Sequence, residues 1–166
     1  MFRLRRRTPH AALILAAVLA SPAAFATNAP ADACSLLPAA AVSKAVGRTF
    51  DAPARSVAPR PFRNTVQGTD CVYRTNGGRG SLMFRVYFDP SPSESAELFK
   101  RLQGFFGAGT ALPGAGDEAY FDGKHGLHER KGNVRFYLEL NGTDTSGPAK
   151  EKVLANMAKE IGGRLQ

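Results

Sequence analysis

The stretch Asp32-Ala33-Cys34-Ser35-Leu36-Leu37-Pro38, together with the distant Cys71, decides how this chain is expected to fold. It carries one of the two cysteines and leads into a helix predicted over residues 38–46, where Pro38 suits the first turn and Gly47 suits the end. A helix this short is marginal by itself. A disulfide between Cys34 and Cys71 would hold its start to the rest of the domain; two free buried thiols are the alternative.

The residues before this stretch predict an exported protein. A cluster of arginines, an apolar run from Ala11 to Ala20 and the small-x-small sequence Ala24-Phe25-Ala26 are typical of a signal peptide at 1–26. The run is about half of the roughly 20 residues that a spanning helix needs, so no membrane anchor is expected after cleavage. Thr8-Pro9-His10 favours general secretion over the twin-arginine route. Residues 27–33 are predicted to be a flexible lead-in to a single domain at 34–166.

Charge is unevenly distributed along the chain. The 22 basic and 14 acidic residues give a net charge of +8, and the predicted signal peptide holds four of the arginines and no acid, which leaves a net charge of +4. Residues 44–85 contain eight basic residues and only two acidic ones, whereas residues 86–166 contain ten basic residues against eleven acidic ones. The whole excess therefore lies in one segment of the exported chain.

The pattern beyond residue 47 predicts an α+β domain. We expect an antiparallel sheet of five to six strands, packed by two longer helices and one short N-terminal helix. The predicted strands are 62–66 at an edge, 70–74, 81–88, 119–121, 126–130 and 134–140. The last strand alternates cleanly, which predicts one face on the core and Arg135, Tyr137 and Glu139 in water.

Two longer helices complete this prediction. The first begins at the capping sequence Ser91-Pro92-Ser93-Glu94 and ends by Gly107. Its apolar stripe is interpreted as core packing rather than as a ligand groove, and consists of Leu98, Leu102, Phe105 and Phe106. The second helix is predicted over 148–161, before Gly162-Gly163.

The order of these motifs resembles a group of bacterial secreted and lipoprotein domains of unknown function, similar in layout to extracytoplasmic sensor-like domains. The resemblance is carried by Asp32-x-Cys34-x-Leu36-Leu37, Cys71-x-Tyr73 and Gly114-x-Gly116-Asp117-Glu118-Ala119-Tyr120. It implies an α+β fold and a Cys34–Cys71 pair, and it implies no catalytic residues. Two features of the group are absent, namely a Thr-Pro-x-Glu cap after the Leu-Leu pair and a lipobox before the cysteine, so a lipid anchor is not carried over.

Candidate catalytic and metal-binding residues are few. Asp117 and Glu118 are adjacent, so on a strand they would point to opposite faces and would not act as a pair. His125 and His128 are the only histidines after the predicted signal peptide, and no third soft ligand lies near them in the sequence. No nucleophile or phosphate-loop motif is present. The sequence therefore predicts a protein that is not an enzyme, with no metal and no cofactor.

A binding module fits this sequence better. Its predicted ligand-binding residues are Arg55, Arg60, Arg63 and Arg74, which lie in the basic segment among aromatic residues. They would suit an anionic component of the cell envelope, or another envelope protein, in the periplasm or outside the cell. Arginines scattered over solvated faces are the alternative, and nucleic acid is disfavoured by export. A small secreted hydrolase or enzyme inhibitor is the second functional hypothesis.

Overall fold

The described part of the chain begins at Asp32. The computed structural model describes residues 32–63, 65–107, 109–123, 126–143 and 147–165. The predicted signal peptide at 1–26, and the predicted lead-in apart from Asp32 and Ala33, lie outside these residues. No helix in the described ranges combines the length and the apolar character that a membrane crossing requires.

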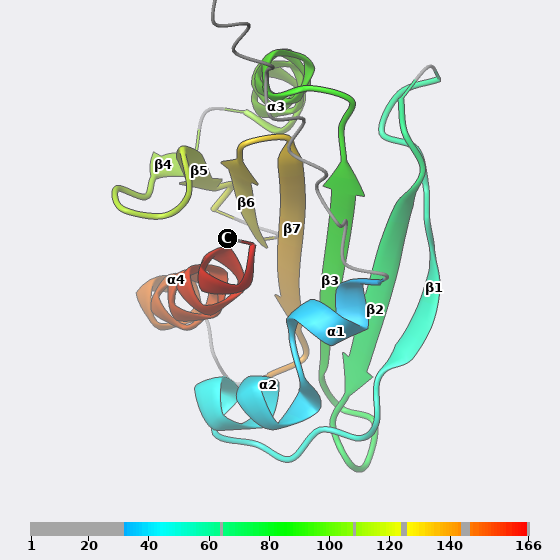
Figure 1. Cartoon of the computed structure of the whole chain (residues 1–166). Helices are drawn as coiled ribbons and strands as arrows, with labels where there is room; N and C mark the ends of the chain where they lie inside the picture. Colours follow the sequence, from blue (N-terminus) through cyan, green and yellow to red (C-terminus); the bar gives the residue numbers. More distant parts are fainter. Residues whose placement is uncertain (1–31, 64, 108, 124–125, 144–146, 166) are drawn as a thin grey trace, which may run out of the picture.

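Four helices and seven strands make up the described residues. The helices are α1 (Ala33–Leu36), α2 (Ala39–Val46), α3 (Pro92–Phe106) and α4 (Gly147–Arg164). The strands are β1 (Ala54–Ala58), β2 (Gly68–Arg74), β3 (Ser81–Phe88), β4 (Thr110–Ala111), β5 (Glu118–Phe121), β6 (Gly126–Lys131) and β7 (Val134–Asn141). They form one antiparallel sheet in the order β1-β2-β3-β7-β6-β5-β4 (Figure 1).

The chain is α+β, but the predicted five to six strands and three helices are wrong. The Thr65 amide and hydroxyl both donate to the Phe62 carbonyl rather than to a neighbouring strand, and the strand at this edge of the sheet is β1, eight residues earlier in the proline-rich segment. β4 has two residues, too few to show a period. The extra helix arises because Pro38, in an extended conformation, separates the single turn of α1 from α2.

The sheet has a core face, which packs against α1, α2 and α4. Side chains that alternate along the central strands point to this face, and α4 adds Leu154, Met157 and Ile161, each almost fully buried. Phe84 and Phe136 meet edge to face with their ring centroids 5.8 Å apart. In Figure 1 the sheet is seen from this side, with the three helices in front of it. The core face is closed and mostly apolar.

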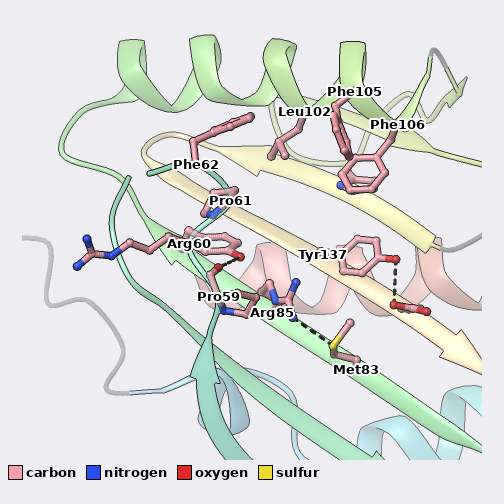
Figure 2. A pocket seen from close by; sticks show the side chains of 13 residues that line it. Pro59, Arg60, Pro61, Phe62, Met83, Arg85, Leu102, Phe105, Phe106 and Tyr137 are labelled. Atoms are coloured by element: carbon pink, nitrogen blue, oxygen red, sulfur yellow. Dashed lines mark hydrogen bonds between the residues drawn. The ribbon is translucent and has the colours of Figure 1, made fainter. Parts of the chain in front are cut away.

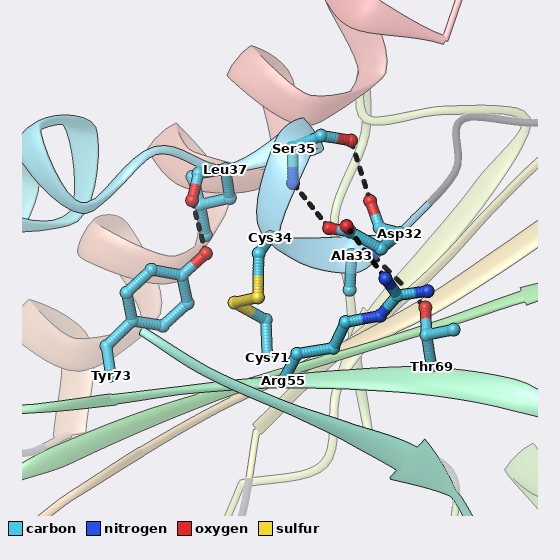
Figure 3. Close-up of a disulfide and its surroundings, with 9 residues drawn as sticks. All are labelled: Asp32, Ala33, Cys34, Ser35, Leu37, Arg55, Thr69, Cys71 and Tyr73. Carbon is cyan, nitrogen blue, oxygen red and sulfur yellow. Dashed lines mark hydrogen bonds and ion pairs between the residues drawn. A yellow bond between two sulfur atoms is a disulfide. The ribbon is translucent and has the colours of Figure 1, made fainter. Parts of the chain in front are cut away.

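The disulfide joins α1 to the core face. Cys34 in α1 is bonded to Cys71 in β2 (Figure 3). Around it, the Asp32 carboxylate accepts the Ser35 amide at 2.9 Å, and the Tyr73 hydroxyl donates to the Leu37 carbonyl. The Ala33 amide also donates to the Thr69 hydroxyl of β2 at 3.1 Å, so the quoted stretch is tied to β2 by a covalent bond and two hydrogen bonds. α2 then ends where Gly47 adopts φ +73°, a conformation that favours glycine.

The opposite face, called the groove face below, is packed by α3. Ser91 caps α3 through the Glu94 amide at 3.2 Å, as the sequence predicts. The prediction that the polar side of β7 lies in water is wrong for Arg135, whose side chain is 2% exposed and bonds the Asp89 carboxylate through two nitrogens. The helix crosses one end of the sheet, so only part of this face is covered (Figure 1).

Candidate functional site

A groove lies on this face between the C-terminal half of α3, the loop at 59–62 and the strands beneath. Its volume is about 400 Å³, within the range of small-molecule sites. Figure 2 shows the side chains of α3 and of the loop facing those of β3 and β7 across the space. The lining residues are Pro59, Arg60, Pro61, Phe62, Met83, Arg85, Tyr87, Leu102, Phe105, Phe106, His128, Tyr137 and Glu139.

Aromatic and apolar side chains of α3 form one wall. Phe105 and Phe106 are 78% and 44% exposed, and their rings meet edge to face at 5.1 Å. The prediction that they pack in the core is wrong. The aromatic residue of α3 that is buried against the sheet is Phe99, which is 3% exposed and contacts the Tyr120 ring at 5.4 Å. Because Phe99 and the buried Ser95 one turn earlier point at the sheet, Phe105 is turned outward to the groove.

Charged and aromatic side chains form the floor. Strand pairing puts Asp70, Arg85, Tyr137, His128 and Tyr120 in one row across five strands. Arg85 donates from Nε and Nη2 to the two Asp70 carboxylate oxygens, at 2.7 and 2.9 Å. The His128 ring stacks on Tyr120 and is tilted against Tyr137, with centroids 4.6 Å away from each. The row joins residues from 70 to 137 of the sequence, so only the pairing register reveals it.

The tyrosines of the floor keep their protons. Burial raises the pKa of Tyr120 and of Tyr137 above the ordinary tyrosine value. For Tyr137 the neighbouring Glu139 carboxylate adds to the rise, and the Tyr137 hydroxyl donates to Glu139 Oε2 at 3.1 Å. These groups therefore act as neutral hydrogen-bonding and stacking surfaces rather than as bases.

The groove holds little catalytic machinery. His128 Nε2 lies 3.4 Å from Asp122 Oδ2, an arrangement that orients a histidine, but the groove lining contains no serine, threonine or cysteine to act as a nucleophile. Within the described ranges no group of three or more His, Cys, Asp or Glu side chains could hold a metal ion. The geometry suits reversible binding.

The other candidate catalytic residues lie outside the groove. The Asp117 carboxylate accepts from Arg130 Nη1 at 2.9 Å and from the Gly132 amide at 2.8 Å, so it fastens a turn. Glu118 lies 3.8 Å from the same arginine. His125 is outside the described residues.

The four predicted ligand-binding arginines do not surround one site. Arg55, on β1, forms an ion pair with Asp32 at 3.3 Å beside the disulfide. Arg60 lines the edge of the groove, and its guanidinium extends away from the cavity in Figure 2. Arg63 lines a second hollow, which shares Phe62 with the groove, and Arg74 ends β2 outside both. Sequence reasoning missed the floor arginine Arg85 as a site residue, although it is one of the eight basic residues of segment 44–85.

Comparison with known proteins shows a likeness of fold. No family model matches the chain, and no curated protein matches its sequence, so the resemblance to secreted domains of unknown function stays a prediction. A solved structure, the extracellular domain of PknH from Mycobacterium tuberculosis, superposes with a TM-score of 0.54 at 11% sequence identity. The match covers 79% of this chain and 93% of that domain. The described α+β architecture therefore also occurs in a solved extracellular domain.

Proposed function

We propose that this chain is an extracytoplasmic, non-catalytic binding module of the sensor-like type, and that the groove binds an amphiphilic component of the cell envelope. The ligand has an apolar body and an anionic group. The observation that carries the proposal is the exposed pair Phe105 and Phe106, which faces a charged floor across a groove of ligand size. A contiguous patch of exposed apolar side chains on a folded domain often marks a ligand-binding groove or an interaction site.

The apolar body of the ligand would lie along the aromatic wall. Phe62, Leu102 and Phe105 contribute carbon surface from two separate segments, the loop and α3. The guanidinium of Arg101 lies 4.2 Å from the centre of the Phe62 ring, a cation–π contact that ties the loop to the helix. The wall is thus held open before the ligand arrives, which lowers the entropic cost of binding.

The anionic group would lie beside Arg85, and the Arg60 side chain, which extends away from the cavity in Figure 2, would turn inward to meet it. Arg85 commits Nε and Nη2 to Asp70, and its remaining nitrogen, Nη1, would supply the contact to the anion. Arg60 forms no ion pair among the described residues. Glu139, near Met83 on the floor, would repel an anion at its own position. The predicted Arg60 therefore keeps a role, whereas Arg55 is engaged elsewhere.

Three observations support a location outside the cytoplasm. Residues 1–26 are predicted to be a signal peptide, the two cysteines form a disulfide, and the fold is shared with an extracellular domain. Structural disulfides form and persist in oxidising compartments.

Two fluorescent probes with closely related apolar bodies test the proposal. 1-Anilinonaphthalene-8-sulfonate carries an anionic group, and N-phenyl-1-naphthylamine is its neutral counterpart. We expect both to bind the folded protein, and Phe105→Ser to weaken both at least fivefold. The control Val57→Ser removes another exposed apolar side chain, 70% exposed on β1 and outside the groove, and should change neither affinity.

Charge variants separate the anionic part of the proposal from the apolar part. Arg60→Gln, and the paired change Asp70→Asn with Arg85→Gln, should weaken the sulfonate probe several-fold and leave the neutral probe unchanged. If the sulfonate probe binds no better than the neutral one, the ligand is not anionic. If Phe105→Ser binds both probes as the wild type does, the groove is not the site.

A further inference from the structure

A buried carboxylate lies on the core face, away from the groove. Glu129 is in β6 and is 0% exposed. Neither of its carboxylate oxygens has a hydrogen-bond partner among the described residues. Its neighbours across the strands on this face are Phe136 in β7 and Ala119 in β5, which offer no donor from their side chains. Burying a carboxylate without hydrogen-bond donors costs free energy, so the presence of Glu129 at this position needs a physical explanation.

The Glu129 side chain fits at this position because two neighbouring residues are glycines. A methyl group added at Gly116, in the loop before β5, would lie 2.9 Å from Glu129 Oε1. One added at Gly162, in the last turn of α4, would lie 3.3 Å from the same oxygen. Glu129 therefore lies directly under the end of α4. A cavity of about 340 Å³ adjoins it, lined by the loop at 114–117, by the end of α4 and by Lys131 and Lys159.

The charged groups around Glu129 come from three elements. Lys131, two residues along β6, donates from Nζ to the Gly162 carbonyl at 2.7 Å and so holds the end of α4. Lys159 of α4 lines the cavity, and Asp117 of the loop lies beside it, already bound to Arg130. Burial raises the pKa of Glu129 to about 7; Lys131 acts to lower it and Asp117 to raise it.

We infer that Glu129 is a proton-operated latch, which keeps the last turn of α4 on the sheet while it is neutral and releases that turn when it ionises. A neutral acid packs under Gly162 at modest cost. An ionised one has no donor where it lies, and it attracts the Lys131 ammonium away from the Gly162 carbonyl. Both effects favour a state in which residues 158–164 lift and water reaches the carboxylate. This inference stands independently of the proposed groove ligand.

The direction of the pH effect follows from proton linkage. Glu129 binds its proton more tightly in the closed state, with a pKa of about 7, than in an open state with an ordinary value of 4.5. The closed state is therefore fully favoured below about pH 4.5 and loses stability as the pH rises toward 7. Between pH 6 and pH 8 the opening equilibrium should still rise about tenfold.

Hydrogen exchange of the full exported chain tests the latch. Protection of amides 158–164, corrected for intrinsic exchange rates, should fall about tenfold from pH 6 to pH 8. Glu129→Gln keeps the shape of the neutral acid and should abolish this change. The control Glu97→Gln makes the same substitution at an exposed position of α3 and should behave as the wild type does. Equal protection of the wild type at both pH values, or an unaltered change in Glu129→Gln, would overturn the inference.

A direct titration keeps the test decisive even if a variant folds poorly. The Glu129 carboxyl carbon, followed by NMR in the wild-type protein, should titrate with a midpoint well above 4.5. A midpoint at the ordinary value would overturn the inference.

Discussion

The two faces of the sheet are built from the same strands, yet they are used differently. The core face is covered by three helices and stapled by the Cys34–Cys71 disulfide, and its side chains are mostly apolar. The groove face has one helix across one end, several arginine–aspartate pairs and a row of stacked rings. A face that is closed by packing stabilises the fold, whereas a face that is partly covered keeps polar groups oriented beside an opening. The difference indicates that binding belongs to the groove face and that its polar pairs hold the floor in place.

Removing the carboxylate that pairs with the buried Arg135 is the most severe test of how the groove face contributes to stability. Asp89→Ala leaves Arg135 charged and 2% exposed without its carboxylate, which should lower the free energy of unfolding by about 3–5 kcal/mol in urea titration. Replacing both residues by apolar ones, as Asp89→Leu with Arg135→Met, should restore most of the loss. If the single variant is as stable as the wild type, the groove face contributes less to stability than its geometry indicates.

Removing the disulfide tests the core face. Cys34→Ala with Cys71→Ala should cost about 3–4 kcal/mol, because the reduced chain regains the entropy of the closed loop. Urea unfolding of this variant, compared with the oxidised wild type, measures the effect. Variants that remain folded should bind the sulfonate probe as before, since neither cysteine lines the groove. Lost probe affinity in a fully folded variant would mean that the two faces are coupled.

Two phenylalanines of the same helix separate packing from binding. Phe99→Ala should lower the free energy of unfolding by roughly 3 kcal/mol, because this side chain is buried against Tyr120. Phe105→Ala should change it by less than about 0.5 kcal/mol and should weaken probe binding instead. Similar stabilities for the two variants would contradict the orientation of α3.

The pH dependence of stability reports the one buried acid that lacks a partner among the described residues of the core face. Stability should fall as the pH rises from about 4.5 to 7, since the pKa of Glu129 is raised to about 7 in the fold. The loss is on the order of 3 kcal/mol for a shift of this size. Urea midpoints across this range should flatten in Glu129→Gln relative to the wild type.

The smallest effect is expected at the edge of the sheet. Arg55 and Asp32 form an ion pair whose arginine side chain is 55% exposed, so Arg55→Ala should cost less than about 1 kcal/mol. Probe binding in the groove should be unchanged. If Arg55→Ala lowers the affinity for the probe, the four predicted arginines would form one binding surface after all.

Local sequence patterns predicted the helices and strands whose periodicity, turns or caps lie in consecutive residues. The alternation of residues 134–140, the turn before residue 81 and the Ser91 cap correspond to β7, the β2–β3 hairpin and the start of α3. β1 was not predicted, because Pro53 and Pro59 flank five residues with no apolar alternation and only pairing with β2 extends them. The groove was not predicted either, because the floor residues Arg85 and Tyr137 are distant in sequence and meet only across the β3–β7 register.

Which side chains share a face of a strand or a helix can be predicted from consecutive residues alone, since period and turn chemistry depend on near neighbours. The sequence also determined that the stretch around Cys34 had a single possible disulfide partner after the predicted signal peptide. What covers each face of the sheet depends on the folded arrangement: three helices pack on the core face, and α3 lies across one end of the groove face. Coverage depends on where distant segments pack, and that packing left Phe105 exposed in the groove and Glu129 buried beneath α4.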